Sequence, residues 1–169
     1  MGYTHYWTIK EPKRGQTANV EKDYQLAIKA CNKIVKTYQE GVTDSWNRLS
    51  GFSAHCKPGQ YGGLKVNGKA ELSHEDFCLR EHYKQNREPL YPSSRKGFNF
   101  CKTANKPYDD VVTACLIVLK HYLKDNIDVN SDGMAHEWLA GLDLARRATK
   151  LKTLSIPEGI EHNADLRLA

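Results

Sequence analysis

The sequence lacks the features that define several large classes of protein. Its 169 residues include five cysteines, an odd number with no C-x-x-C pair, so we expect neither a disulfide framework nor a structural zinc site. The longest apolar run, residues 111–119, is interrupted by Thr113 and is too short to span a bilayer. The first residues have neither the basic nor the apolar segment of a signal peptide. These absences predict a soluble, cytoplasmic protein with reduced thiols and no membrane partner.

Catalytic signatures are missing as well. The turn over residues 102–107 has none of the glycines of a phosphate-binding P-loop. His136-Glu137 does not begin an H-E-x-x-H zinc motif, because position 140 is Ala140. His74-Glu75 could supply a general base or a metal ligand, but His74 has no second histidine at metal-ligand spacing, and a solvent-facing turn histidine is the alternative. We therefore predict no cofactor and no metal, and the sequence leaves enzymatic activity open.

The composition and length suit one globular domain with three helices. Hydrophobic residues make up 40% of the chain and charged residues 27%, which is ordinary for a globular protein. A single apolar stripe predicts a helix from Thr17 or Asn19 to Gly41. Residues 107–124 are apolar on nearly every side, which is typical of a central, buried helix. A third helix is expected over residues 134–150.

The strands are expected between these helices. Alternating side chains predict strands over residues 2–10, 64–72, 77–79, 98–103 and 127–129, and Asn67-Gly68 favours a two-residue hairpin turn within the second of them. Residues 43–63 have no sustained periodicity and are read as a loop. The order predicts an α+β fold, with about three helices on a small, mainly antiparallel sheet, in one domain over residues 1–150. A weakly ordered or interface-forming tail would follow over residues 151–169.

The junction between the fourth strand and the central helix is the first candidate site. Lys102 and Lys106 offer two ammonium groups, Thr103 offers a hydroxyl, and Pro107 would open the helix beside them. The start of a helix attracts anions, so this junction is a sensible place to bind phosphate. Asp109 and a neighbouring asparagine could instead be simple helix caps. The candidate ligand-binding residues here are Lys102, Thr103, Lys106, Tyr108 and Asp109.

The positive charge is concentrated around this junction. Residues 80–106 hold seven basic and two acidic side chains, a net charge of +5 that equals the net charge of the whole chain. A local positive potential favours an anionic partner. A solvated basic loop that only aids solubility is the alternative, since runs of charge are usually solvated.

Aromatic residues of the first strand and one turn carboxylate complete the candidate set. Tyr3, His5 and Trp7 would share one face of the strand, where rings can stack on a nucleobase or pack in the core. Asp132, in the turn 130–133, could accept a hydrogen bond from a ribose hydroxyl, although an ordinary turn is the favoured interpretation.

Several of these segments together resemble one known group of proteins. The segments are Gly2-Tyr3-Thr4-His5-Tyr6-Trp7, His74-Glu75-Asp76-Phe77, Phe100-Cys101-Lys102-Thr103 with Lys106-Pro107-Tyr108-Asp109, and residues 129–133 followed by Trp138. They resemble small uncharacterised proteins encoded by phages, prophages and bacterial genomes. The resemblance covers most of the first 145 residues and transfers no catalytic residues. It implies a phage context, a bacterial host cytoplasm and a possible role against host defence.

The residues and this context lead to three hypotheses. The first is a protein that binds and sequesters a small phosphate-bearing nucleotide signal, such as a cyclic adenine nucleotide, without cleaving it. The second is a nucleotide-cleaving phosphodiesterase or related hydrolase that uses His74 and Glu75 as acid and base. The third is a nucleic-acid-binding or host-protein-binding module built on residues 80–106. The sequence leaves open whether the chain forms a homo-oligomer.

Overall fold

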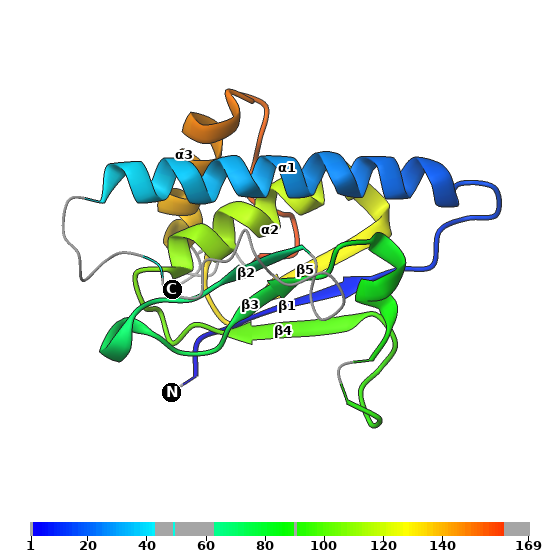
Figure 1. Cartoon of the computed structure of the whole chain (residues 1–169), viewed down its shortest axis with the longest axis horizontal. Coiled ribbons are helices and arrows are strands. Elements are labelled where there is room, and N and C mark those ends of the chain that lie inside the picture. Colours follow the sequence, from blue (N-terminus) through cyan, green and yellow to red (C-terminus); the bar gives the residue numbers. More distant parts are fainter. Residues whose placement is uncertain (1, 43–48, 50–62, 90, 161–169) are drawn as a thin grey trace, which may run out of the picture.

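A computed structural model describes residues 2–42, 49, 63–89 and 91–160 (Figure 1). Strands β4, β1 and β5 form an antiparallel sheet with β1 at its centre, and β2 and β3 form a separate antiparallel pair. The chain order confirms the predicted α+β fold. The elements are β1 (Thr4–Ile9), α1 (Thr17–Gly41), β2 (Leu64–Val66), β3 (Phe77–Leu79), β4 (Phe98–Lys102), α2 (Asp109–Leu123), β5 (Ile127–Ser131) and α3 (Leu139–Thr149).

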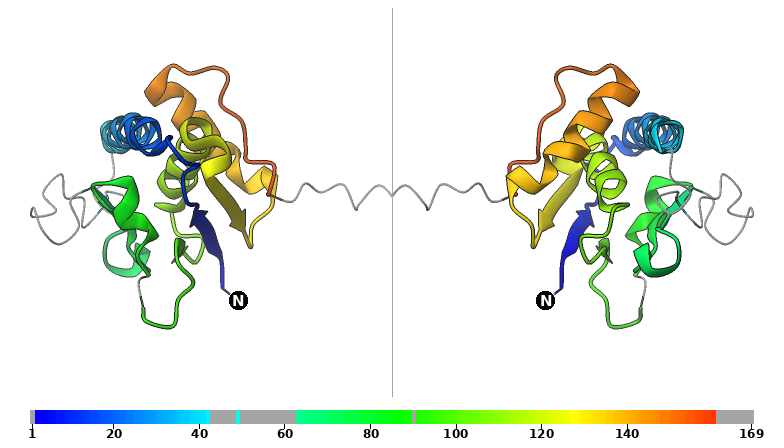
Figure 2. Two further views of the ribbon diagram at one scale, coloured as in Figure 1. Left: turned by 90° about the vertical axis from the view of Figure 1, so that its right-hand side faces the viewer. Right: turned by 90° about the vertical axis from the view of Figure 1, so that its left-hand side faces the viewer.

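Helix α2 forms the centre of the molecule. Every residue from 111 to 119 is buried, because α2 packs against α1, α3 and the sheet (Figures 1 and 2). All three helices lie on the same side of the three-stranded sheet. The prediction of a central helix covered on several sides is confirmed.

The three-stranded sheet has one buried face and one open face. On β1, His5, Trp7 and Ile9 point toward the helices and are buried. Tyr6 and Thr8 point the other way, where they are only half-buried and no helix covers them within the described ranges (Figure 2). The alternation of side chains along β1 therefore separates a core face from an outer face.

The beginning of β4 depends on a glycine. Gly97 has a φ of +78°, and a Cβ added there would lie 2.1 Å from the carbonyl oxygen of Ile9. Only glycine combines this backbone conformation with such a close approach. The amide of Ile9 donates to the carbonyl of Gly97 over 2.8 Å, which fixes the register of β4 against β1.

The connection from β2 to β3 differs from the expected two-residue hairpin. Strand β2 ends at Val66, residues 70–72 form a 3₁₀ turn, and the partner strand is β3 rather than residues 70–72. The cause is the side chain of Asn67, which donates to the carbonyl of His74 and accepts from the amides of Gly68 and His74. These bonds close a longer connection than a type I′ turn would.

The helix starts also differ in detail from the expected ones. Gln16, rather than Thr17 or Asn19, occupies the N-cap position of α1. Helix α2 begins at Asp109, two residues after Pro107, and α3 follows a 3₁₀ turn at residues 135–138. The predicted loop over residues 43–63 lies almost entirely outside the described residues.

The segment after α3 packs on the domain as far as Ile160. Leu154 and Ile160 are buried, and the guanidinium of Arg146 donates to the carbonyl of Leu154 over 2.7 Å. Residues 161–169 of the predicted tail lie outside the described residues. In the parts of the chain that the structure describes, no helix combines the length and apolar character that crossing a membrane requires.

Candidate functional site

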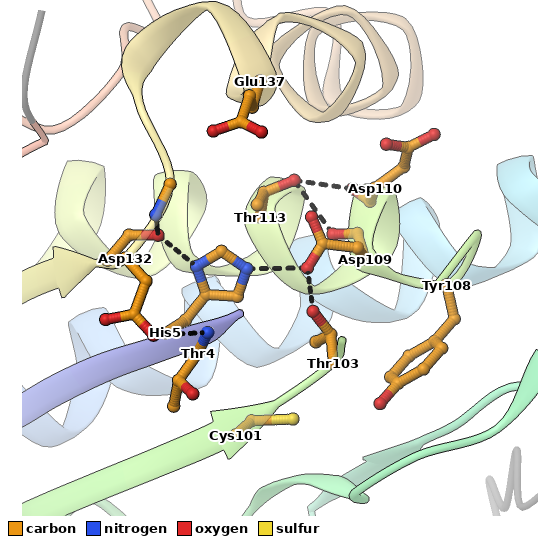
Figure 3. A network of polar contacts seen from close by, with 12 residues as sticks. Thr4, His5, Cys101, Thr103, Tyr108, Asp109, Asp110, Thr113, Asp132 and Glu137 are labelled. Atoms are coloured by element: carbon orange, nitrogen blue, oxygen red, sulfur yellow. Dashed lines mark hydrogen bonds and ion pairs between the residues drawn. The ribbon is translucent and has the colours of Figure 1, made fainter. Parts of the chain in front are cut away.

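A buried polar network joins β1, β5 and the start of α2 (Figure 3). The Nε2 atom of His5 forms a 2.6 Å hydrogen bond with Oδ1 of Asp109, which also accepts a 2.5 Å bond from the Thr103 hydroxyl. The other ring nitrogen of His5 lies 2.9 Å from the hydroxyl oxygen of Ser131. His5 and Thr103 are fully buried and Asp109 is 3% exposed. The network therefore supplies hydrogen-bond partners to the buried side chains of His5, Thr103 and Asp109, and it faces no solvent.

This network changes the role of the predicted phosphate site. The hydroxyl of Thr103 points to Asp109, so it does not face an anion from solvent. The first amides of α2 are also occupied: Asp109 donates to the carbonyl of Lys106, and Asp110 to that of Pro107. Lys102 and Lys106 remain half-buried at this junction. Of the groups expected to bind phosphate here, only the two lysines reach the surface.

Other predicted residues serve as structural contacts. Tyr108 is buried, and its hydroxyl donates to the carbonyl of Glu75 over 2.7 Å. Tyr3 is half-buried with its ring edge-on to His5. Asp132 accepts a 3.0 Å hydrogen bond from the amide of Thr4 and one from the Tyr6 hydroxyl. Burial raises the pKa of the Tyr3 and Tyr108 hydroxyls, so both stay protonated at neutral pH.

Two predicted residues, Trp7 and His74, line the same cleft of about 410 Å³ between β3 and the free edge of β4. Trp7 is 2% exposed, and its ring packs against Phe77. His74 is exposed. A volume of this size is within the range of small-molecule sites. The lining residues are Trp7, His74, Glu75, Asp76, Cys78, Arg80, Asn86, Tyr91, Asn99 and Phe100.

The main chain of Phe100 faces this cleft. In an antiparallel pair, residues that exchange main-chain hydrogen bonds alternate with residues that do not. The amide of Thr103 donates to the carbonyl of Tyr3, and the amide of Ile9 donates to the carbonyl of Gly97. The bonded pairs of the β1–β4 ladder therefore include His5 with Cys101 and Trp7 with Asn99, and the pair of Tyr6 and Phe100 between them is not bonded. The N–H and C=O of Phe100 consequently point away from β1, toward the free edge of β4.

Among the described residues, Phe100 is the residue of β4 whose N–H and C=O are both open on this edge, and the carbonyl of Phe98 is open beside it. Two residues later, the amide of Lys102 donates to the carboxylate of Glu75, and the carbonyl of Lys102 accepts from the Glu75 amide. Two residues earlier, the amide of Phe98 donates to the carbonyl of Arg95. Within the described ranges, no hydrogen bond reaches the main chain of Phe100 from this side. The free edge of β4 therefore offers the adjacent donor and acceptor of Phe100, with the carbonyl of Phe98 as a further acceptor.

The charged side chains around the cleft differ in how many of their polar groups already bond within the protein. Asp76 forms an ion pair with Lys65 over 2.8 Å and accepts from Asn67. Arg80 donates from one guanidinium nitrogen to the carbonyl of Gln85, and a guanidinium has five N–H groups in all. Arg80 can thus bind an anion while it keeps this contact.

Two asparagines fix the wall of the cleft. The amide group of Asn86 accepts from the main chain of Arg80 and donates to the Tyr24 hydroxyl. Asn99 donates to the carbonyls of Asn86 and Gly97. Both side chains are nearly fully buried. These bonds hold Arg80 and β4 in place on either side of the cleft.

The sequence contains weak signals for this site. Arg80 belongs to the basic segment, and the alternation along residues 98–102 places Phe98, Phe100 and Lys102 on one face and Asn99 on the other. A buried asparagine in a strand indicates a side chain with structural hydrogen bonds. No sequence pattern shows that residues 73–80 lie beside β4, so the cleft itself was not predictable.

In comparisons with protein-family models, curated proteins and solved structures, no family model, curated protein or solved structure matches the chain. Among the described residues, no group of three or more histidine, cysteine, aspartate or glutamate side chains is arranged to hold a metal ion.

Proposed function

We propose that the protein binds a small phosphate-bearing nucleotide in the cleft between β3 and β4 and holds it without cleaving it. The observation that carries this proposal is the main chain of Phe100, whose N–H and C=O are open to the cleft. A nucleobase edge presents an acceptor beside a donor, which complements such a pair.

The short open edge favours a base over a peptide. A peptide that extends a sheet must pair with several residues of the edge strand. Glu75 occupies the edge at Lys102, and Arg95 accepts the amide of Phe98. The two main-chain groups of Phe100 and the carbonyl of Phe98 remain, a stretch too short for a peptide strand but sufficient for a planar heterocycle. Trp7 and Tyr91 contribute aromatic surface to the walls around it.

The phosphate would bind to Arg80 and His74. Both side chains line the cleft, and the free guanidinium N–H groups of Arg80 match phosphate oxygens. In the phage setting that the resemblance implies, retaining such a nucleotide would remove a signal from the host. A protein that sequesters its ligand needs no catalytic group.

A specific observation keeps hydrolysis as a second candidate. His74 and Glu75 both line the cleft that would hold the phosphate, and a histidine with a carboxylate can act as acid and base. One Glu75 carboxylate oxygen accepts from Lys102. Cleavage of the bound nucleotide would identify this activity.

We expect calorimetric titration to detect binding of at least one of the four nucleoside 5′-monophosphates, or of a cyclic dinucleotide of two adenosines. The variant Arg80→Gln should weaken this binding about tenfold or more, since it removes charge-assisted hydrogen bonds to phosphate. Lys84→Gln, which removes an exposed charge from the same segment, should change it less than about twofold.

The outcome of these titrations separates the candidate functions. Ligand recovered intact after heat denaturation supports sequestration, whereas cleaved product supports hydrolysis. Equal losses in Arg80→Gln and Lys84→Gln would indicate a diffuse basic surface, as in the nucleic-acid hypothesis. No binding of any probe at millimolar concentration would refute the proposal.

The thiol of Cys78 provides a second test inside the cleft. Cys78 is half-buried and lines the cleft, whereas Cys31, Cys101 and Cys115 are buried. Burial raises the pKa of the Cys101 and Cys115 thiols, which keeps them unreactive.

In a Cys56→Ser background, we expect iodoacetamide to alkylate Cys78 selectively in the native protein, as measured by peptide mass spectrometry. The alkylated protein should lose nucleotide binding, because the added group occupies the cleft. Conversely, a bound nucleotide should slow the alkylation. Full binding by the alkylated protein would place the nucleotide elsewhere.

A further inference from the structure

The outer face of the sheet carries three aromatic rings beside the cleft. The rings of Tyr6 and Phe98 stack with centroids 6.2 Å apart, and those of Phe98 and Phe100 lie 6.1 Å apart. All three side chains are half-buried on a face that no helix covers in the described ranges (Figure 2). Exposed rings on an open sheet are the usual platform for stacking the bases of a single strand.

Positive groups accompany these rings. The guanidinium of Arg95 lies 5.6 Å from the centre of the Phe98 ring, and Lys102 follows Phe100 on the same face of β4. The carboxylates on this face are engaged, since Asp128 pairs with Lys10 over 2.8 Å and Asp132 accepts from Tyr6. Asp132 keeps its negative charge, because a neutral hydroxyl does not cancel a carboxylate. Arg95, Lys102 and Lys10 therefore exceed the two carboxylates of this face by one positive charge.

Phe100 belongs to both surfaces. Its main chain faces the cleft at the edge of β4, and its side chain lies on the outer face opposite Tyr6. The two surfaces are thus continuous around one strand edge. A phosphodiester that leaves a base in the cleft can cross this edge and place its next base on the rings.

We propose that the ligand has two bases joined by a phosphodiester, one in the cleft and the other stacked on Tyr6, Phe98 and Phe100. This inference rests on the proposed nucleotide binding in the cleft. The shared chemistry fits two sources, a short single strand and a cyclic dinucleotide. Lys102, predicted from the sequence to bind phosphate, would then lie near the linkage between the bases.

The test compares adenosine 5′-monophosphate, a linear 5′-phosphorylated dinucleotide of adenosine and the corresponding cyclic dinucleotide. We expect at least one dinucleotide to bind about tenfold or more tightly than the mononucleotide, as one added stacked base allows. A tighter linear probe indicates a single strand as the source, and a tighter cyclic probe a cyclic signal.

The variant Tyr6→Leu with Phe98→Leu keeps apolar bulk and removes two rings. It should abolish the advantage of the dinucleotide and leave mononucleotide binding unchanged. As an independent readout, a dinucleotide with one 5-iodouracil should photo-cross-link to the outer-face rings. The second-base site is overturned if the mononucleotide binds and no dinucleotide binds more tightly, or if cross-links form only away from the rings. Either result leaves the proposed nucleotide site in the cleft standing. Failure of every probe overturns both proposals.

Discussion

Asp109→Ala should destabilise the protein by about 2–6 kcal/mol, because each buried donor left unsatisfied costs about 1–3 kcal/mol and two donors lose this partner. Asp109 is 3% exposed, and one of its oxygens takes hydrogen bonds from both His5 and Thr103. Loss of the carboxylate leaves those two fully buried groups without this partner. Urea denaturation followed by circular dichroism measures the change.

Asp110 is the matched control, since it is the next residue in the same turn of α2. Burial, and then the charge of Asp109, raise the pKa of Asp110 above its ordinary value of 3.8. The folded state therefore binds this proton more tightly than the unfolded state, so ionisation of Asp110 lowers stability as the pH rises.

Asp110→Asn should consequently be at least as stable as the native protein at pH 7. Its advantage should shrink as the pH falls toward 3.8, where Asp110 is protonated in the folded state. Equal destabilisation by Asp109→Ala and Asp110→Asn would show that the His5 network contributes no more than any carboxylate in this turn.

The sequence predicted the elements of the fold better than their contacts. The periodicity of α1 and the apolar character of α2 are local properties, because burial selects residues at fixed spacings along each helix. The structure bears out both helices. The β2–β3 connection was missed because the side chain of Asn67 bonds to His74, a choice that the Asn-Gly dipeptide does not reveal.

The site was only partly predictable for the same reason. His5 and Asp109 are 104 positions apart, yet their side chains form one hydrogen bond. Read locally, Thr103 is a free hydroxyl beside two lysines, and only the folded chain shows that it donates to Asp109. Trp7 and His74 lie 67 positions apart in the sequence, and the fold places both in the wall of one cleft.

The variant Phe100→Pro should weaken nucleotide binding about as strongly as Arg80→Gln. Proline removes the amide N–H that the base would accept from, and it fixes an extended conformation at Asn99, which is already in a strand. The ladder between β1 and β4 loses no hydrogen bond, because the pair of Tyr6 and Phe100 does not bond across it. Proline is tolerated at such edge positions.

Phe100→Leu is the control, since it removes the ring and keeps the N–H. With adenosine 5′-monophosphate or whichever mononucleotide binds best, we expect Phe100→Pro to weaken binding about tenfold or more, and Phe100→Leu to stay within about threefold of the native protein. Thermal denaturation of both variants establishes that each is folded.

If both folded variants bind the mononucleotide equally well, the edge of β4 does not recognise the base. In that case the cleft would have to act through its side chains alone, and Arg80→Gln would become the decisive comparison, because the guanidinium is the strongest phosphate-binding group in the cleft wall.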